Sequence, residues 1–228
     1  MRPSRTPCMG TKCAGMSGLR RLERALTVSE LLVLVAVIAL LIWVLGPKAF
    51  EPVRTRIRTA KCASQLMSIG VAFRLYAGDY GDLFPSALIH DDLWLTNCDE
   101  TLVYAWRRLS KELGSPRFLV CPGDTRFAAV NFESMTRSNL SYFMSIDASP
   151  GAPQMLLAGD RNISSNGVQL NPGLFDPGTN CILTTTKELH RGVACLLFVD
   201  GHVTRYRSGQ PSERGSSLTI ATNRLAIP

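Results

Sequence analysis

The chain has 228 residues, 46% of them hydrophobic, and a formal net charge of +7, which suits one ordinary domain with an appendage. Most of the excess positive charge lies in residues 1–25, where Glu23 is the one acidic residue. The rest of the chain is therefore nearly neutral. This excludes a strongly basic binding module, and we expect no nucleic-acid partner.

Residues 1–25 form a basic leader, and residues 26–47 form an apolar segment that contains one charge, Glu30. A helix from Leu26 to Leu45 would be about 30 Å long, close to the thickness of a hydrocarbon core. The pattern predicts a transmembrane helix over 26–47. A soluble core helix and a cleaved secretory signal are alternatives, but Trp43–Pro47 lacks the small residues of a signal cleavage site.

The boundary between leader and apolar segment carries a recognisable motif. Arg20, Arg21 and Arg24 precede Ala25-Leu26-Thr27-Val28-Ser29-Glu30. This pattern resembles the type IV pilin-like prepilins, although Ala25 replaces the usual glycine and Leu26 the usual phenylalanine. The resemblance implies cleavage between Ala25 and Leu26 by a prepilin peptidase, which methylates the new N-terminus. It also implies that Glu30 meets the N-terminus of a neighbouring subunit; a mere boundary marker is the alternative. Met1 and Met16 both remain possible starts.

Residues 48–80 are expected to continue the helix as an amphipathic segment. Val53, Ile57, Phe73 and Tyr76 recur at helical spacing on one face. The turn-forming residues Gly78–Asp82 are expected to end it.

Residues 81–207 are expected to form a globular α+β domain, followed by a polar tail over 208–228. A short helix is predicted over Leu102–Leu113, and Asp200-Gly201 predicts a hairpin turn. The predicted strands are Phe118–Cys121, Leu140–Ile146, Met155–Leu157, Cys181–Thr185, Ala194–Val199 and His202–Tyr206. The predicted fold is thus a long N-terminal helix, transmembrane in its first half and amphipathic in its second, packed on a C-terminal antiparallel sheet in a pilin-like manner.

Later segments strengthen the resemblance to one branch of pilin-like proteins. They are KCASQLMSIGVAFRLYAGDYGDLFP, RFLVCPGDTR, NLSYFMSIDA, LLAGDRNI and HRG…LLFVDGHV. The resemblance implies a structural pseudopilin of a type II secretion system or a related pilus-like machine. The implied partners are a prepilin peptidase, other pseudopilins and membrane lipid. The implied location is the bacterial inner membrane, with a cytoplasmic N-terminus and an extracytoplasmic C-terminal domain.

Two other functions remain open, namely a DNA-uptake or minor pilin and a membrane-anchored binding or enzymatic domain. His190, Asp200 and His202 invite a metal or hydrolase interpretation. However, the chain has no HExxH, phosphate-binding loop, nucleophile elbow or CxxC motif. We therefore expect no enzymatic activity, no cofactor and no metal site.

Calcium ligands and disulfides are the remaining possibilities. Oxygen ligands for calcium are available at Asp79, Asp82, Asp160, Asn162 and Asp176, but their spacing matches no calcium loop, so turn formation is favoured. The cysteines after the leader are Cys62, Cys98, Cys121, Cys181 and Cys195. A Cys98–Cys121 disulfide is the preferred pairing, although the sequence does not fix connectivity.

Overall fold

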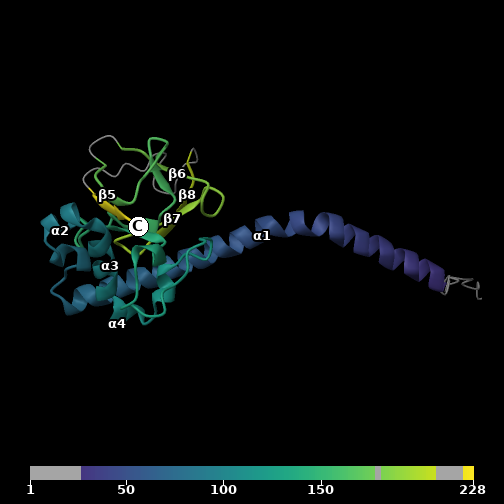
Figure 1. Ribbon diagram of the computed structural model, residues 1–228, viewed down its shortest axis with the longest axis horizontal. Coiled ribbons are helices and arrows are strands. Elements are labelled where there is room, and N and C mark those ends of the chain that lie inside the picture. Colours follow the sequence, from purple (N-terminus) through teal and green to yellow (C-terminus); the bar gives the residue numbers. More distant parts are fainter. Residues whose placement is uncertain (1–26, 178–180, 209–222) are drawn as a thin grey trace, which may run out of the picture. The chain divides into compact units, whose positions relative to one another are not determined.

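The structure is a computed structural model that describes residues 27–177, 181–208 and 223–228 (Figure 1). It divides into two compact units, 1–47 and 48–228, which are described separately. The helices are α1 (Val28–Asp79), α2 (Asp91–Thr96), α3 (Cys98–Arg108) and α4 (Ser110–Leu113), with 3-10 turns η1 (Pro85–Leu88), η2 (Pro116–Leu119) and η3 (Arg137–Asn139). The strands are β1 (Tyr142–Ser145), β2 (Leu156–Asp160), β3 (Ile163–Ser165), β4 (Val168–Gln169), β5 (Gly173–Phe175), β6 (Leu183–Thr185), β7 (Ala194–Phe198), β8 (Val203–Tyr206) and β9 (Leu225–Ile227).

The transmembrane first half predicted for the N-terminal helix is wrong. Across the residues that the structure describes, none of the helices has the length and apolar character needed to cross a membrane. The uncharged run 31–47 would make about 25 Å of helix, against roughly 30 Å of hydrocarbon. The predicted fold class is corrected in this respect. The predicted single-pass location in the bacterial inner membrane, with an extracytoplasmic C-terminal domain, is corrected with it.

The second unit is built around an antiparallel sheet. Six strands pair in the order β5-β9-β1-β2-β7-β8, and β4-β3-β6 form a smaller sheet. The turn between β7 and β8 is the predicted hairpin at Asp200-Gly201, where Gly201 has a φ of +85°. Because an L-residue with a side chain rarely adopts this φ, glycine suits the position.

Strand β7 shows how the sequence fills two cores. Successive side chains of a strand point to opposite faces of the sheet. Leu196 and Phe198 therefore belong to a core that also contains Leu183 of β6. Cys195 and Leu197 face the other way, into the larger core that contains the helices.

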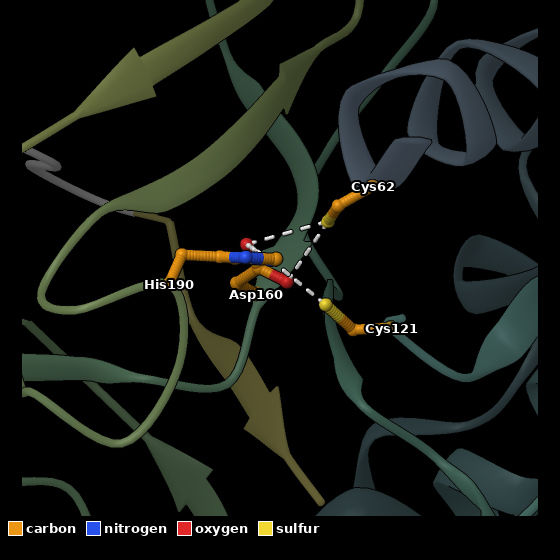
Figure 2. Close-up of side chains that lie close together, drawn as sticks. All are labelled: Cys62, Cys121, Asp160 and His190. Carbon is orange, nitrogen blue, oxygen red and sulfur yellow. Dashed lines mark hydrogen bonds and ion pairs between the residues drawn. The ribbon is translucent and has the colours of Figure 1, made fainter. Parts of the chain in front are cut away.

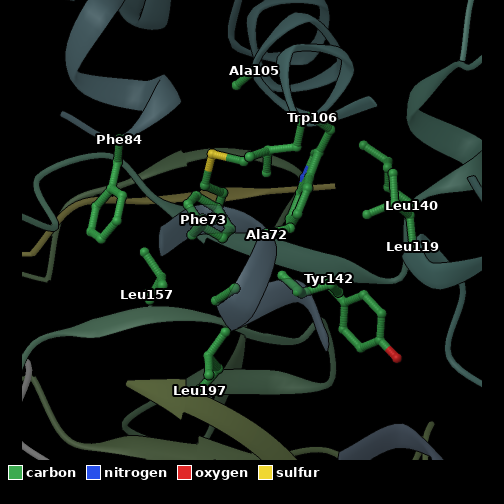
Figure 3. Close-up of a cluster of buried hydrophobic side chains, with 14 of the residues drawn as sticks. Ala72, Phe73, Phe84, Ala105, Trp106, Leu119, Leu140, Tyr142, Leu157 and Leu197 are labelled. Atoms are coloured by element: carbon green, nitrogen blue, oxygen red, sulfur yellow. The ribbon is translucent and has the colours of Figure 1, made fainter. Parts of the chain in front are cut away.

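The larger core lies where α1 and α3 meet the sheet (Figure 3). Phe73 of α1 and Trp106 of α3 are fully buried and contact each other edge to face, with ring centroids 5.8 Å apart. Phe84 packs against the same Phe73 ring at 5.4 Å. Leu157 and Leu197 line the sheet side of this core.

Two predicted segments differ in the structure. The predicted strand Phe118–Cys121 is not a strand. Its first two residues lie in the 3-10 turn η2, because Pro116 starts the turn and the Ser115 hydroxyl accepts a hydrogen bond from the Arg117 N–H. The predicted polar tail ends in strand β9, which pairs with both β1 and β5. Leu225, Ala226 and Ile227 are buried there, so short apolar runs after polar residues can still belong to the core.

Gly159 of β2 is expected to tolerate no side chain. A Cβ there would lie 2.8 Å from Leu196 and Phe143 atoms and 2.9 Å from the Cys195 carbonyl oxygen. We predict that Gly159→Ala lowers the free energy of unfolding by about 1–3 kcal/mol through overpacking, measured by urea denaturation. The control is Gly78→Ala, a helical site with open space around the Cβ, which should be neutral or stabilising. Equal effects of the two substitutions would contradict the packing described at Gly159.

Candidate functional site

The predicted processing site, Ala25 and Leu26, lies outside the described residues, whereas Glu30 is described and exposed. Glu30 Oε2 accepts hydrogen bonds from the backbone N–H of Thr27 at 3.0 Å and from its hydroxyl at 2.9 Å. The Glu30 N–H donates in return to the Thr27 hydroxyl oxygen at 3.3 Å. This reciprocal arrangement is a capping box at the start of α1. The backbone hydrogen bond, followed by the hydroxyl one, lowers the pKa of Glu30.

The helical segment 28–44 exposes apolar side chains on every face. Consecutive residues such as Leu32, Val33 and Leu34 are each at least half exposed, and so is Trp43. A helix that is apolar all round normally lies among apolar neighbours. An exposed apolar surface of this kind is typical of an interaction site.

The residues considered for calcium or hydrolytic chemistry do not gather as a set. Asp79 is exposed and pairs with Lys111 at 3.5 Å. Asp200 lies in the β7–β8 turn, where its Oδ1 accepts a hydrogen bond from the His202 N–H at 2.9 Å. Among the described residues, one group of His, Cys, Asp and Glu side chains lies close enough together to bind a metal ion. It contains Asp160 and His190 together with two cysteines.

This buried cluster consists of Cys62, Cys121, Asp160 and His190 (Figure 2). Their potential ligand atoms all lie within 4.8 Å of one another. Cys62 Sγ is 3.2 Å from Asp160 Oδ1, and Cys121 Sγ is 2.9 Å from His190 Nε2. His190 Nε2 is also 3.7 Å from Asp160 Oδ2. The sequence predicts no metal site and predicts that Asp160 forms a turn. It does not predict this arrangement.

Four separate segments supply the cluster. Cys62 lies on α1, Cys121 follows η2, Asp160 ends β2, and His190 lies in the loop between β6 and β7. Asn162 fixes this last loop, because its side-chain amide donates to the backbone carbonyls of residues 186, 189 and 193. His190 itself has a φ of +46°, an uncommon value for a residue with a side chain.

Gly123 allows the His190 ring to reach the cluster. A Cβ at this position would lie 2.6 Å from Cε1 and 2.9 Å from Nδ1 of His190. The backbone of the Cys121–Gly123 turn thus passes directly against the imidazole. A larger residue at 123 would displace the ring from its cysteine partner.

Burial sets the electrostatics of the cluster. It raises the pKa of the Asp160 carboxyl to about 6 and, with the Arg58 charge, lowers that of His190. Hydrogen bonding to Cys121 and Cys195, together with burial, raises the pKa of the Cys62 thiol. All three shifts favour the uncharged forms, as expected for polar groups removed from water. A bound cation would reverse this preference for the carboxyl and thiol groups.

The close Cys121–His190 contact also raises the possibility of a nucleophilic dyad. Such a dyad requires a thiol that a substrate can reach and a third group that orients the imidazole. Here the Cys121 residue is 1% exposed, and His190 Nδ1 has no hydrogen-bond partner among the described residues. The geometry fits metal coordination better than covalent catalysis.

The predicted Cys98–Cys121 disulfide is wrong. The five cysteines of the described residues are free thiols: Cys62, Cys98, Cys121, Cys181 and Cys195. Cys98 is half-buried at the start of α3, and burial raises its pKa to about 11. Cys121 instead faces His190 and Cys62. The spacing of the cysteines along the chain does not show which residues lie beside Cys121 in the folded protein.

A groove of about 570 Å³ borders the cluster at His190. Four arginines line it, namely Arg56, Arg191, Arg205 and Arg207. The groove surface is therefore positively charged and suits anions, whereas the buried thiol and carboxyl groups suit a cation. These are two chemically different neighbouring environments.

Comparisons with known proteins identify no relative. No family model, curated protein or solved structure matches the chain. Function is therefore argued from the residues and their geometry.

Proposed function

We propose that the chain is a structural subunit of the pseudopilin type, which assembles with other copies or related subunits into a type II secretion or related pilus-like machine. The observation that carries the proposal is the all-round apolar surface of residues 28–44. Side chains such as Leu34 and Ile38 are about half exposed within the first unit. Contact with the equivalent segment of another copy would remove this surface from water.

The N-terminal motif supports the same proposal. The frame Ala25-Leu26-Thr27-x-x-Glu30 follows a basic leader, as in prepilins. Cleavage after Ala25 by a prepilin peptidase would create an ammonium group near the start of α1. In a packed bundle of apolar helices, the Glu30 carboxylate of one copy would attract this group on another, since charges interact more strongly there than in water.

Glu30 borders a shallow apolar hollow on its helix, formed with Ser29, Val33, Leu34 and Val37. Its hydrogen bonds from Thr27 favour the ionised form, because they lower the pKa of the carboxyl. An ionised carboxylate beside an apolar surface suits a contact with a cationic partner. The capping box alone would need no charge.

Glu30→Gln is expected to abolish assembly while leaving the helix start intact. Glutamine retains a side-chain oxygen for the capping box but removes the charge. The measurement is chemical crosslinking of the full chain in its native cells, followed by immunoblotting. We predict a ladder of multimers for the wild type and chiefly monomer for Glu30→Gln.

Glu51→Gln is the matched control, because Glu51 is a half-exposed carboxylate elsewhere on α1. Its exposed ion pair with Arg191 at 3.2 Å contributes little stability. The control should give the wild-type ladder. Equal ladders for Glu30→Gln and wild type would show that Glu30 acts as a helix cap alone.

A further inference from the structure

We propose that Cys62, Cys121, Asp160 and His190 bind one Zn²⁺ ion in a closed structural site of the globular unit. The four residues lie in segments far apart in the sequence, and their side chains point toward one another (Figure 2). A metal ion bound to all four would tie helix α1 to β2 and to the loops that carry Cys121 and His190. This site is independent of the assembly proposed above.

Three of the six ligand-atom separations can be compared with tetrahedral coordination, and all six are below 4.8 Å. With Zn–S bonds of about 2.3 Å and Zn–N or Zn–O bonds of about 2.0–2.1 Å, ligand atoms are separated by roughly 3.3–3.8 Å. The Asp160–His190 separation of 3.7 Å and the Cys62–Asp160 separations of 3.2 and 3.4 Å are close to these values. The Cys121–His190 separation of 2.9 Å would have to widen by roughly 0.6 Å.

Neighbouring groups are placed to support charged ligands. The Gly123 N–H donates to Cys121 Sγ at 3.4 Å, and the Cys195 N–H donates to Asp160 Oδ2 at 2.8 Å. Such outer contacts orient metal ligands and stabilise thiolate and carboxylate charge.

The set of donor atoms selects the type of metal. Two sulfurs and an imidazole nitrogen suit zinc, whereas calcium and magnesium prefer oxygen ligands throughout. Binding releases the protons of the two thiols to solvent, and Asp160 coordinates as carboxylate. Because all four side chains are buried, the site has no evident position for a substrate, which indicates a structural role.

Metal analysis of the purified full chain tests the proposal. After reconstitution with zinc and removal of loosely bound ions, we predict about one zinc per chain by mass spectrometry of the metal content. Cys62→Ser and Cys121→Ser should each lower the zinc affinity by about tenfold or more. Cys181→Ser is the matched control, because Cys181 is a buried thiol in the other core and should leave zinc content unchanged.

Gly123→Ala provides a second variant that removes no ligand. The added methyl group would displace the His190 ring and should lower zinc affinity, whereas Gly151→Ala, with its nearest neighbour atom at 4.0 Å, should not. Should the cysteine variants fail to fold, two wild-type measurements still decide. Cobalt substitution should produce a thiolate charge-transfer absorption, and a chelator should lower Tm in a way that zinc restores and magnesium does not.

Three results would each overturn the zinc site. The first is less than about a tenth of a zinc per reconstituted wild-type chain, far below the expected single ion. The second is unchanged zinc affinity in Cys121→Ser. The third is a Cys62–Cys121 disulfide in the native protein, detected by peptide mass after alkylation of free thiols. None of these measurements depends on assembly through residues 28–44.

Discussion

Trp106→Ala is expected to lower the free energy of unfolding by about 3–5 kcal/mol, because it removes a fully buried indole from the centre of the larger core. The Trp106 ring packs edge to face against Phe73, so the substitution also removes an aromatic pair. Unfolding in urea, followed by circular dichroism, measures the change without depending on tryptophan emission.

Two further substitutions sharpen this test. Trp106→Phe keeps much of the ring volume and removes an indole N–H that has no hydrogen-bond partner among the described residues, so its cost should be clearly smaller. Leu95→Ala, at a side chain that is 67% exposed, should change stability by less than about 0.5 kcal/mol. A cost for Trp106→Ala below that of Leu95→Ala would contradict the placement of α3 in the core.

Arg161→Met is also expected to cost about 3–5 kcal/mol, because it leaves a buried carboxylate without its cation. The Asp124 side chain is 1% exposed and receives hydrogen bonds from Arg161 Nε at 2.9 Å and Nη2 at 3.1 Å. The double variant Asp124→Asn/Arg161→Met removes both charges and should recover part of the loss. Urea denaturation at neutral pH compares the two, and equal stabilities would contradict a buried charge at Asp124.

The same pair predicts a dependence on pH. Burial acts to raise the pKa of Asp124, but hydrogen bonds from Arg161 and Ser141 outweigh it, and the pKa lies below its ordinary value of 3.8. The folded state therefore favours the ionised carboxylate. Its contribution to stability is present above pH 3.8 and is lost as the pH falls through the lower pKa of the folded state. Denaturation midpoints measured toward acidic pH should show a smaller loss in Asp124→Asn than in the wild type.

Local patterns in the sequence identified several elements of the globular unit. The continuous apolar run Ala194–Val199 corresponds to β7, and Asp200-Gly201 forms the expected turn. Ser115 and Pro116 are typical of the start of a 3-10 turn, and η2 begins there, where the predicted strand Phe118–Cys121 is absent. The short apolar run Leu225–Ile227 gave no comparable signal, because its burial depends on pairing with distant strands.

The cluster of Cys62, Cys121, Asp160 and His190 could not be found from spacing along the chain. Short repeats such as CxxC place ligands together through local geometry, whereas Cys62, Cys121, Asp160 and His190 meet only when the whole unit folds. The sequence offers both His190 and Asp160 as metal ligands, but it does not indicate that they lie beside Cys62 and Cys121. The one local hint is Cys121-Pro122-Gly123, where a glycine allows close approach of another chain segment.

The prediction for the N-terminal segment failed in a different way. Its apolar composition appears in the structure as an exposed apolar surface, but composition alone does not identify what such a surface contacts. The membrane was the wrong assignment, since the described part of the chain contains no helix able to span it. The hydrogen bonds of Thr27 with Glu30 add a role as a helix cap, which the motif Thr-x-x-Glu also encodes.

Photocrosslinking at Ile38 tests assembly through residues 28–44 most directly. A photoreactive amino acid placed at Ile38, which is 47% exposed, should capture a second copy in native cells, at a peptide within residues 28–44 of that copy. The same probe at Leu75, which is 56% exposed on the later part of α1, should capture far less. Monomer alone at Ile38, or equal capture of a second copy at both positions, would contradict assembly through this segment.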